Sequence, residues 1–384
     1  MSARRRDVMK RKSFLIAFVV AVILFSGCSI ADTPAISAEQ AEYQPEEDYD
    51  LEIERLGQMV DTILTGNNFR GVALVAQNGT TVLRAAYGMA CDAQNIENTV
   101  YLPFHLASVT KHFTGAAILL LGLDGKLDTS DTLDNFFIGH DGLGNVTVAH
   151  LLAMKGGFYN YENRLLGLIE AGEFEKGLSL SAEDIEAHII SNWSGVPQDY
   201  SVYCNSDYWL LGRIIEQVSG MTYEEFVANR LFAPAGMVNS GFGGMHESVA
   251  PHGIQSVYFG GQNVMDLTNL PFHFLYSTGG LVSTVDDLNI WLDAYFDGEL
   301  FPKHLLDDIS AGRYNYGWIF ADDEIWHHPG SMPGFNTWVI HDRSSGTRII
   351  LLSNETRGVA ELVRAVSVAV LGTPIAGMGI PIGS

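Results

Sequence analysis

The hydrophobic and polar positions predict strands near both ends of the chain and helices between them. The apolar stretch 72–84 is typical of two strands, and Asn78-Gly79 between them is a strong signal for a tight hairpin turn. Strand patterns return late in the chain, at 316–320, 324–328, 336–341 and 348–353. This order predicts a sheet completed by the two ends of the chain, with a helical region inserted in its middle.

Helical periodicity fills the space between these strands. An early helix is expected over 51–64 and a last one over about 359–371. Between them, helical patterns occur at 148–154, 182–191, 208–218, 223–231 and 285–295. No internal repeat is evident, so these helices belong to one inserted region and not to an array of repeated units.

The most apolar of the expected helices begins beside a serine and a lysine. From Thr114 to residue 121 it is apolar on nearly every side, which predicts burial in the core. Ser108 and Lys111 stand three positions apart at its start and share a helix face. A lysine in an apolar interior has a lowered pKa and can then take the proton of a serine hydroxyl. The pair is a candidate nucleophile and base; the alternative is a helix cap and an ordinary first-turn residue.

A tyrosine and an asparagine stand directly before the helix expected at 208–218. Tyr203 could relay the serine proton to a leaving group, and the Asn205 amide could hold the lysine or a substrate carbonyl. Tyr-Glu-Asn at 161–163 has the same pattern and competes for this role. We favour Tyr203 because a loop next to a buried helix is positioned rigidly; the alternative is a core tyrosine with a satisfied hydroxyl.

The sequence His-Pro-Gly-Ser at 328–331 follows a predicted strand and leads into a turn. Glycine at 330 removes a side chain where a ligand would approach the backbone, and the proline, which donates no backbone hydrogen bond, suits an edge strand. The N–H of Ser331 could pair with that of Ser108 to form an oxyanion hole. A second His-x-Gly, at 140–142, lies in a glycine-rich loop with no strand around it.

The first residues are laid out as a signal peptide. A basic region precedes an apolar run at 14–25, short for a membrane span, and Ser-Gly-Cys at 26–28 resembles a bacterial lipobox. Cys28 is then the lipidated first residue of the mature protein; a retained signal anchor and a simply cleaved signal are the alternatives. Residues 1–28 are assigned to the signal and the acidic stretch 29–50 to a flexible tether. All three possibilities predict an exported body, on the extracytoplasmic face of the membrane or secreted.

Composition narrows the possible partners. With 384 residues and 47% hydrophobic positions the chain is long and apolar enough to be globular. The formal net charge of −23 at pH 7 repels polyanions, so no nucleic acid is expected. Export permits a disulfide between Cys91 and Cys204, but a single pair is weak evidence for one. The histidine and cysteine spacings suggest no metal, and no cofactor is expected.

Taken in order, these segments resemble the serine beta-lactamase-like, penicillin-binding-protein-like hydrolases. The similarity is to the branch of class C beta-lactamases, D-alanyl-D-alanine carboxypeptidases, D-aminopeptidases and esterase-like members. The family motifs Ser-x-x-Lys and Tyr-x-Asn occur at 108–111 and 203–205, and His-x-Gly at 328–330 replaces Lys-Thr-Gly. The resemblance implies a hydrolase domain over 51–372, followed by a tail at 373–384.

The resemblance also implies a fold and a set of roles. The expected fold is α/β (α+β), an antiparallel sheet flanked by helices and built from both chain ends, with an all-helical region inserted at about 125–300. Ser108 would be the acylated nucleophile, with Lys111 and Tyr203 as the proton-transfer pair. The expected substrate-binding and oxyanion positions are Asn205, His328, Gly330 and Ser331.

The expected function is an extracytoplasmic serine hydrolase that cleaves an ester or amide in a small molecule or peptide, such as a D-amino-acid peptide or a beta-lactam-like compound. Histidine in place of the motif lysine removes a fixed cation, so efficient beta-lactamase action is not expected. If protonated, His328 could still bind a carboxylate, because the ordinary pKa of histidine lies near neutral pH. The alternative is a catalytically silent relative that binds cell-wall peptide or a protein partner.

Overall fold

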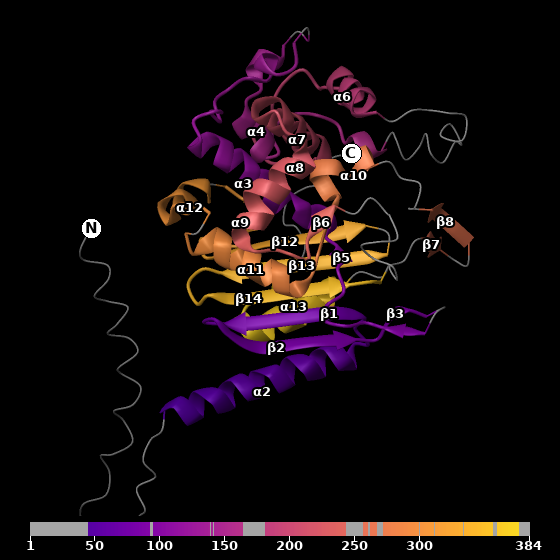
Figure 1. Cartoon of the computed structure of the whole chain (residues 1–384), viewed down its shortest axis with the longest axis vertical. Coiled ribbons are helices and arrows are strands. Elements are labelled where there is room, and N and C mark those ends of the chain that lie inside the picture. Colours follow the sequence, from indigo (N-terminus) through magenta and orange to yellow (C-terminus); the bar gives the residue numbers. More distant parts are fainter. Residues whose placement is uncertain are drawn as a thin grey trace, which may run out of the picture. The chain divides into compact units, whose positions relative to one another are not determined.

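The sheet expected from the two ends of the chain is present (Figure 1). The computed structural model describes residues 45–92, 95–138, 140, 142–163, 181–242, 256–259, 262–266, 272–298, 300–310, 312–332, 334–355 and 359–375. Among these residues, seven antiparallel strands lie in the order β10-β11-β12-β13-β14-β1-β2, so the first strand pairs with the last. Their bounds are β1 Gly71–Gln77, β2 Thr80–Tyr87, β10 Tyr314–Asn315, β11 Trp318–Phe320, β12 Ile325–Met332, β13 Phe335–Asp342 and β14 Thr347–Ser353.

Helices cover the sheet on both faces, and the alternation of side chains along β1 shows it. Val72 and Leu74 belong to one core, with residues of α3 and α11, whereas Ala73 and Val75 belong to a second core, with residues of α2 and α13. Every residue of β14 is buried, as expected for a strand covered on both sides. These helices are α2 Pro45–Gly66, α3 Thr110–Leu123, α11 Val285–Phe296 and α13 Ala360–Leu371.

The inserted region is mainly helical, and α3 passes through it (Figure 1). Capping boxes start three of its helices, at Thr147, Ser181 and Thr222. The α-helices are α4 Val148–Leu152, α6 Ala182–Ser191, α7 Asn205–Ser219, α8 Tyr223–Val227, α9 Ala233–Ala235, α10 Phe272–Gly279 and α12 Lys303–Ile309. Shorter helical turns are η1 Ala107–Val109, η2 Leu133–Asn135, η3 Leu143–Asn145 and η4 Ala228–Phe232.

Short strands form one small sheet between distant parts of the chain and two local pairs. In the described residues, β5 Phe104–His105 and β6 Gly241–Phe242 both pair with β9 Leu281–Ser283. The other pairs are β3 Met89–Cys91 with β4 Ile96–Glu97, and β7 Ser256–Phe259 with β8 Gln262–Asp266. The sheet that contains β5 lies just before the turn that carries Ser108, so it helps to fix the approach to that residue.

The predicted elements are present, with shifted ends. Asn78 and Gly79 both have positive φ, 49° and 78°, as a tight turn with two left-handed central residues requires. Helix α7 begins three residues before the predicted start, at Asn205. Strand β12 extends through the predicted turn to Met332, while its pairing with β11 ends at His327. Pro329 therefore lies in the part of β12 beyond its pairing with β11, where β12 is an edge strand.

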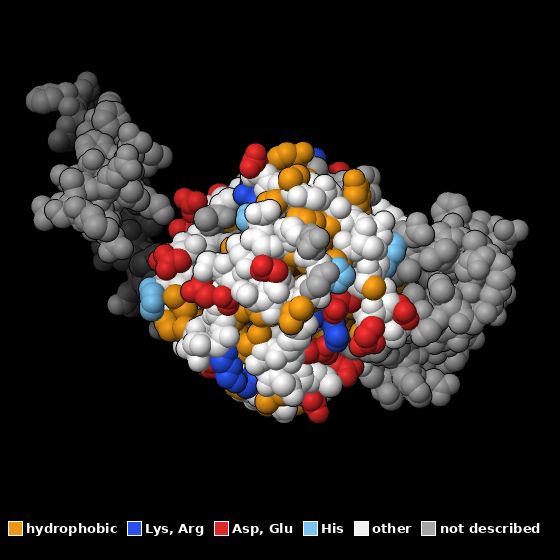
Figure 2. Space-filling view, turned by 90° about the horizontal axis from the view of Figure 1, so that it is seen from above, with side chains coloured by type: hydrophobic (Ala, Val, Ile, Leu, Met, Phe, Trp, Pro, Cys, Tyr) orange, Lys and Arg blue, Asp and Glu red, His pale blue; other side chains and the backbone are white. Residues whose placement is uncertain are grey.

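The chain termini extend largely beyond the described residues. The predicted signal peptide, Cys28 and most of the tether fall outside them, but α2 already begins at Pro45, so the last residues assigned to the tether are helical. In the part of the chain that the structure describes, no helix has both the length and the apolar character needed to cross a bilayer. Acidic side chains are spread over the face in Figure 2, in keeping with the net charge of −23 at pH 7.

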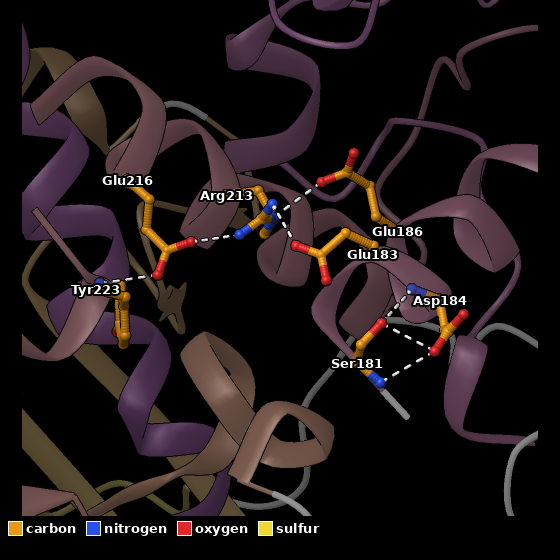
Figure 3. A network of polar contacts seen from close by, with 7 residues as sticks. All are labelled: Ser181, Glu183, Asp184, Glu186, Arg213, Glu216 and Tyr223. Atoms are coloured by element: carbon orange, nitrogen blue, oxygen red, sulfur yellow. Dashed lines mark hydrogen bonds and ion pairs between the residues drawn. The ribbon is translucent and has the colours of Figure 1, made fainter. Parts of the chain in front are cut away.

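A half-buried arginine joins α6 to α7 (Figure 3). Arg213 Nε lies 2.8 Å from Glu186 Oε2, and its Nη1 lies 2.6 Å from Glu216 Oε2. Glu216 Oε1 also accepts the N–H of Tyr223 at 3.0 Å, which brings the first residue of α8 into the network. Burial alone would lower the pKa of Arg213, but its hydrogen bond with Glu186 and the two carboxylate charges raise it above the usual value. The guanidinium is therefore charged and forms ion pairs with both carboxylates.

Replacing Arg213 with glutamine is expected to lower the free energy of unfolding by about 2 kcal/mol, because it leaves Glu186 and Glu216 close together without their cation. Urea denaturation followed by tryptophan fluorescence measures the change. The matched control is Glu183→Gln, since Glu183 is 77% exposed and lies 3.6 Å from the same guanidinium. It should cost less than about 0.5 kcal/mol. Equal losses in the two variants would show that the network does not hold α6 to α7.

Candidate active site

Ser108 lies on a strained turn that is fixed from several sides. The residue before it, Ala107, has a φ of 46° although it is not a glycine, a conformation that persists only where neighbours impose it. The Leu106 N–H donates to the carbonyl of Leu281 in β9 at 2.8 Å. The Leu106 carbonyl accepts the hydroxyl of Thr337 in β13 at 2.9 Å. Through Leu106, the turn is thus hydrogen-bonded to strands of two different sheets.

The structure brings Ser108, Lys111 and Tyr203 together. Lys111 Nζ lies 3.1 Å from Ser108 Oγ, and the Tyr203 hydroxyl lies 2.6 Å from the same oxygen. Lys111 Nζ also donates to the carbonyl of Thr278, at the end of α10, at 2.8 Å. The serine hydroxyl therefore has an amine and a phenol within hydrogen-bonding distance, which is the geometry that proton transfer to and from it requires.

Burial sets the charge of both partners of the serine. It lowers the pKa of Lys111 from 10.5 to about 7, against the opposing effect of Glu162. Burial raises the pKa of Tyr203 far above its ordinary value. At neutral pH the amine can therefore both bind and release a proton, while Tyr203 remains a phenol that can donate one.

The competing Tyr-Glu-Asn segment contributes a carboxylate instead of a proton-relaying tyrosine. The Tyr161 hydroxyl donates to the carbonyl of Phe274 and makes no contact with Ser108. Glu162 Oε2 instead accepts the Asn205 amide at 2.6 Å. The amide nitrogen of Asn205 is therefore directed to a carboxylate and not to the lysine. Glu162 has no local signal in the sequence as a site residue, because its adjacency to Asn205 arises only from folding.

Glycine is required at position 330 because other parts of the chain lie against it. The sequence had instead suggested that a ligand approaches the backbone there. A Cβ at this position would lie 2.1 Å from the Leu106 carbonyl oxygen and 2.2 Å from Thr337 Oγ1. Only glycine lets β12 lie this close to the turn before Ser108. The neighbouring Ser331, the next residue of the same strand, is exposed.

His328 lies in the interior and is uncharged, so it is not the carboxylate-binding cation that its ordinary pKa allowed. Its side chain is fully buried, and its Nδ1 donates to the carbonyl of Pro329 at 2.6 Å, since a carbonyl can only accept. Burial and then the charge of Lys111 hold the pKa of His328 well below its usual value. Its ring centroid lies 6.0 Å from that of Tyr203 and 5.6 Å from that of Tyr314. His140, of the second His-x-Gly, is exposed.

Cys91 and Cys204, the two cysteines considered for a disulfide, are both free thiols. The Cys204 thiol is buried and donates to the carbonyl of Phe158 at 3.3 Å. Among the residues the structure describes, no group of three or more histidine, cysteine or acidic side chains is placed to hold a metal ion.

Comparison with known proteins agrees with this fold. The model of the family described as beta-lactamase matches residues 56–372. PbpX of Bacillus subtilis (strain 168) is 29% identical over 301 residues, covering 77% of this chain and 73% of that protein.

Solved structures give the same result. A penicillin binding protein from Bacillus halodurans has a TM-score of 0.68 and 24% identity, covering 80% of this chain and 98% of that one. D-amino acid amidase from Ochrobactrum anthropi SV3, in complex with L-phenylalanine amide, has a TM-score of 0.69 and 21% identity, covering 83% of this chain and 99% of that one. At these identities the two structures establish a common fold. Together with the family match over most of its length, they place the chain in the beta-lactamase family, and it is a serine hydrolase with the beta-lactamase/transpeptidase fold.

Proposed function

We propose that this serine hydrolase cleaves esters or amides through an acyl-enzyme formed on Ser108, with Lys111 and Tyr203 as its proton-transfer pair. The observation that carries the proposal is the meeting of Lys111 Nζ and the Tyr203 hydroxyl at the hydroxyl oxygen of Ser108, at 3.1 Å and 2.6 Å. A serine needs a base this close to become a nucleophile. The strained, fixed turn at Ala107 supports the same assignment, because such strain is typical of active sites.

In the proposed reaction, the neutral amine of Lys111 takes the Ser108 proton while Oγ bonds to the substrate carbonyl carbon. The carbonyl oxygen becomes an oxyanion, and Tyr203 donates a proton to the leaving group as its bond to carbon breaks. Tyr203 then regains a proton from Lys111, which returns to its neutral form. Water then attacks the acyl ester by the same route, which releases the acid and restores the serine hydroxyl.

The proposed oxyanion hole consists of the N–H groups of Ser108 and Ser331. Backbone groups alternate in direction along an antiparallel strand, so those of Ser331 and Pro329 point to the same side of β12. The Pro329 carbonyl accepts from the neighbouring His328 side chain, and Pro329 has no N–H for β13. Since β11 pairs with β12 only as far as His327, the side of β12 opposite β13 has no strand neighbour at Ser331 among the residues that the structure describes. This supports a free N–H beside Ser108.

The proposed substrates are small esters, amides or peptides. The relatives named above include a D-amino acid amidase and a penicillin binding protein, which makes amides of D-amino acids and beta-lactam-like compounds the first candidates. The uncharged His328 provides no fixed cation for a substrate carboxylate, so poor turnover of beta-lactams is proposed. We also propose that Cys28 anchors the chain by lipid outside the cytoplasm, because the sequence before it has the layout of a bacterial lipoprotein signal.

A substrate screen tests this proposal. The purified full-length protein is assayed with short p-nitrophenyl esters, nitrocefin and D-amino-acid amides. Saturable hydrolysis of at least one ester or amide is expected, faster than that of nitrocefin. If no compound is turned over and no serine-directed probe is retained, the chain is a binding relative and the proposal is wrong.

The pH dependence of hydrolysis should reflect the charge of Lys111. Its pKa lies at about 7, and the neutral amine is the base, so kcat/KM should rise with pH through this value and level off above it. The measurement is kcat/KM for p-nitrophenyl acetate from about pH 5 to about pH 9, after subtraction of spontaneous hydrolysis. A profile that is flat across neutral pH, or that falls with rising pH, would contradict the role of Lys111 as the base.

A further inference from the structure

A carboxylate that the proposed mechanism does not use lies beside the proton-transfer pair. Glu162 follows the buried Tyr161 and contacts the first residue of α7, where Asn205 Nδ2 donates to Glu162 Oε2 at 2.6 Å. The same asparagine is held at its backbone, whose N–H donates to Asn160 Oδ1 at 2.6 Å. The segment 160–162 and the start of α7 are thus joined by two hydrogen bonds, two residues after Tyr203.

We propose that Glu162 is a positioning residue of this hydrolase, whose negative charge governs the protonation of Lys111 and whose oxygen orients the Asn205 amide. This inference rests on the proposed function. It assigns to Glu162 no contact with the reacting atoms.

The neighbours of Lys111 make Glu162 the charge that matters. Apart from Glu162, the titratable side chains that act on Lys111 or touch it are His112 on α3, His328 on β12, and Tyr203 and Cys204 before α7. Burial keeps each of these four uncharged at neutral pH, since it lowers the pKa of the two histidines and raises the pKa of the phenol and the thiol. Among the described residues that act on Lys111, Glu162 is therefore the group whose negative charge would matter at neutral pH.

The balance between burial and this carboxylate explains why the amine titrates near neutral pH. Burial alone would keep Lys111 deprotonated to lower pH, whereas the charge of Glu162 acts in the opposite direction. The two groups act on each other, because Lys111 likewise opposes the rise in the pKa of Glu162 that burial causes. A base that must take a proton and return it to the leaving group works best with a pKa near the operating pH.

The carboxylate also determines which atom of the Asn205 amide is left for other partners. An ionised carboxylate only accepts hydrogen bonds, so it holds the amide with Nδ2 toward itself. The other amide atom, Oδ1, is buried and has no hydrogen-bond partner among the described residues. Asn205 therefore offers an acceptor oxygen, which does not fit the substrate carbonyl that the sequence suggested as its ligand.

The test is the pH profile of Glu162→Gln. Glutamine keeps the size of the side chain and an oxygen for Asn205 but removes the charge. The acid limb of kcat/KM for p-nitrophenyl acetate is expected to move to lower pH by about one unit, since Lys111 loses its stabilising anion. A purely structural role would lower kcat/KM equally at every pH and leave the limb in place. Glu183→Gln, the exposed glutamate of α6, is the control and should keep the wild-type limb.

Glu162→Asp gives a second, milder variant in case the first does not fold. It keeps the charge but withdraws it by one methylene, so a smaller shift in the same direction is expected. An acid limb that stays at its wild-type position in both variants, or moves to higher pH, would overturn this inference. Failure of the proposed function has a different signature, namely a wild-type protein without any labelling or turnover that depends on Ser108.

Discussion

Replacing Ser108 with alanine will abolish covalent labelling by a fluorophosphonate or penicillin-type probe and will remove ester hydrolysis. The substitution deletes the oxygen to which Lys111 and Tyr203 are both hydrogen-bonded, and no acyl-enzyme can form without it. A loss in kcat/KM of at least about a thousandfold is expected, because a nucleophile and its base act as one unit. Gel fluorescence of the labelled protein and p-nitrophenol release are the two measurements.

The control for this variant is Ser191→Ala, at the end of α6, where the hydroxyl donates to the backbone carbonyl of His188 and accepts from the Asn192 amide. It should retain full labelling and turnover. Thermal melts of both variants close to that of the wild type would show that the loss is chemical. Undiminished labelling of the Ser108 variant would mean that another residue is acylated, and the assignment of the nucleophile would have to be abandoned.

Replacing Lys111 with methionine should reduce kcat/KM by about a thousandfold, while the protein stays folded. Methionine fills a similar volume in the core but cannot accept the serine proton. Lys111 is fully buried, so the change also removes an amine whose charged form is costly in the interior, which limits the loss of stability. Turnover of p-nitrophenyl acetate and the rate of fluorophosphonate labelling should fall together, because both depend on an activated Ser108.

Lys126→Met provides the comparison. Lys126 is exposed in the loop that follows α3, and its replacement should leave turnover unchanged. A Lys111 variant that keeps more than about a tenth of wild-type activity would show that Tyr203 or water can serve as the base instead.

The parts of the fold that could be predicted from the sequence are those whose signals are local. Helix α6 occupies its predicted range, because Ser181 and Asp184 form a capping box directly before an amphipathic run. The hairpin of β1 and β2 was equally evident, since Asn78-Gly79 dictates the turn. The sheet of β5, β6 and β9 had no such signal. Its strands have two or three residues each and exist only through pairing between segments far apart in the chain.

The residues of the candidate site also differ in whether a local signal in the sequence predicts them. The spacing of Ser108 and Lys111 and the position of Tyr203 before a helix could be identified in the sequence, and the structure places the three side chains in contact. The burial of His328 could not, because it depends on aromatic residues of other elements, such as Tyr314. The close approach of the Leu106 carbonyl to Gly330 could not be predicted either, because the two residues are far apart in the sequence.

The bond between the Leu106 carbonyl and Thr337 joins residues 231 positions apart in the chain. Because synthesis proceeds from the N-terminus, Ser108 emerges long before the strand that fixes its turn. A nascent chain that ends before β12 lacks this support and, in our proposal, also the Ser331 side of the oxyanion hole. Pairing over such a separation forms late and slowly during folding. The proposed catalytic centre would thus be completed only once nearly the whole polypeptide is available, so an unfinished chain would carry its serine without the means to activate substrates.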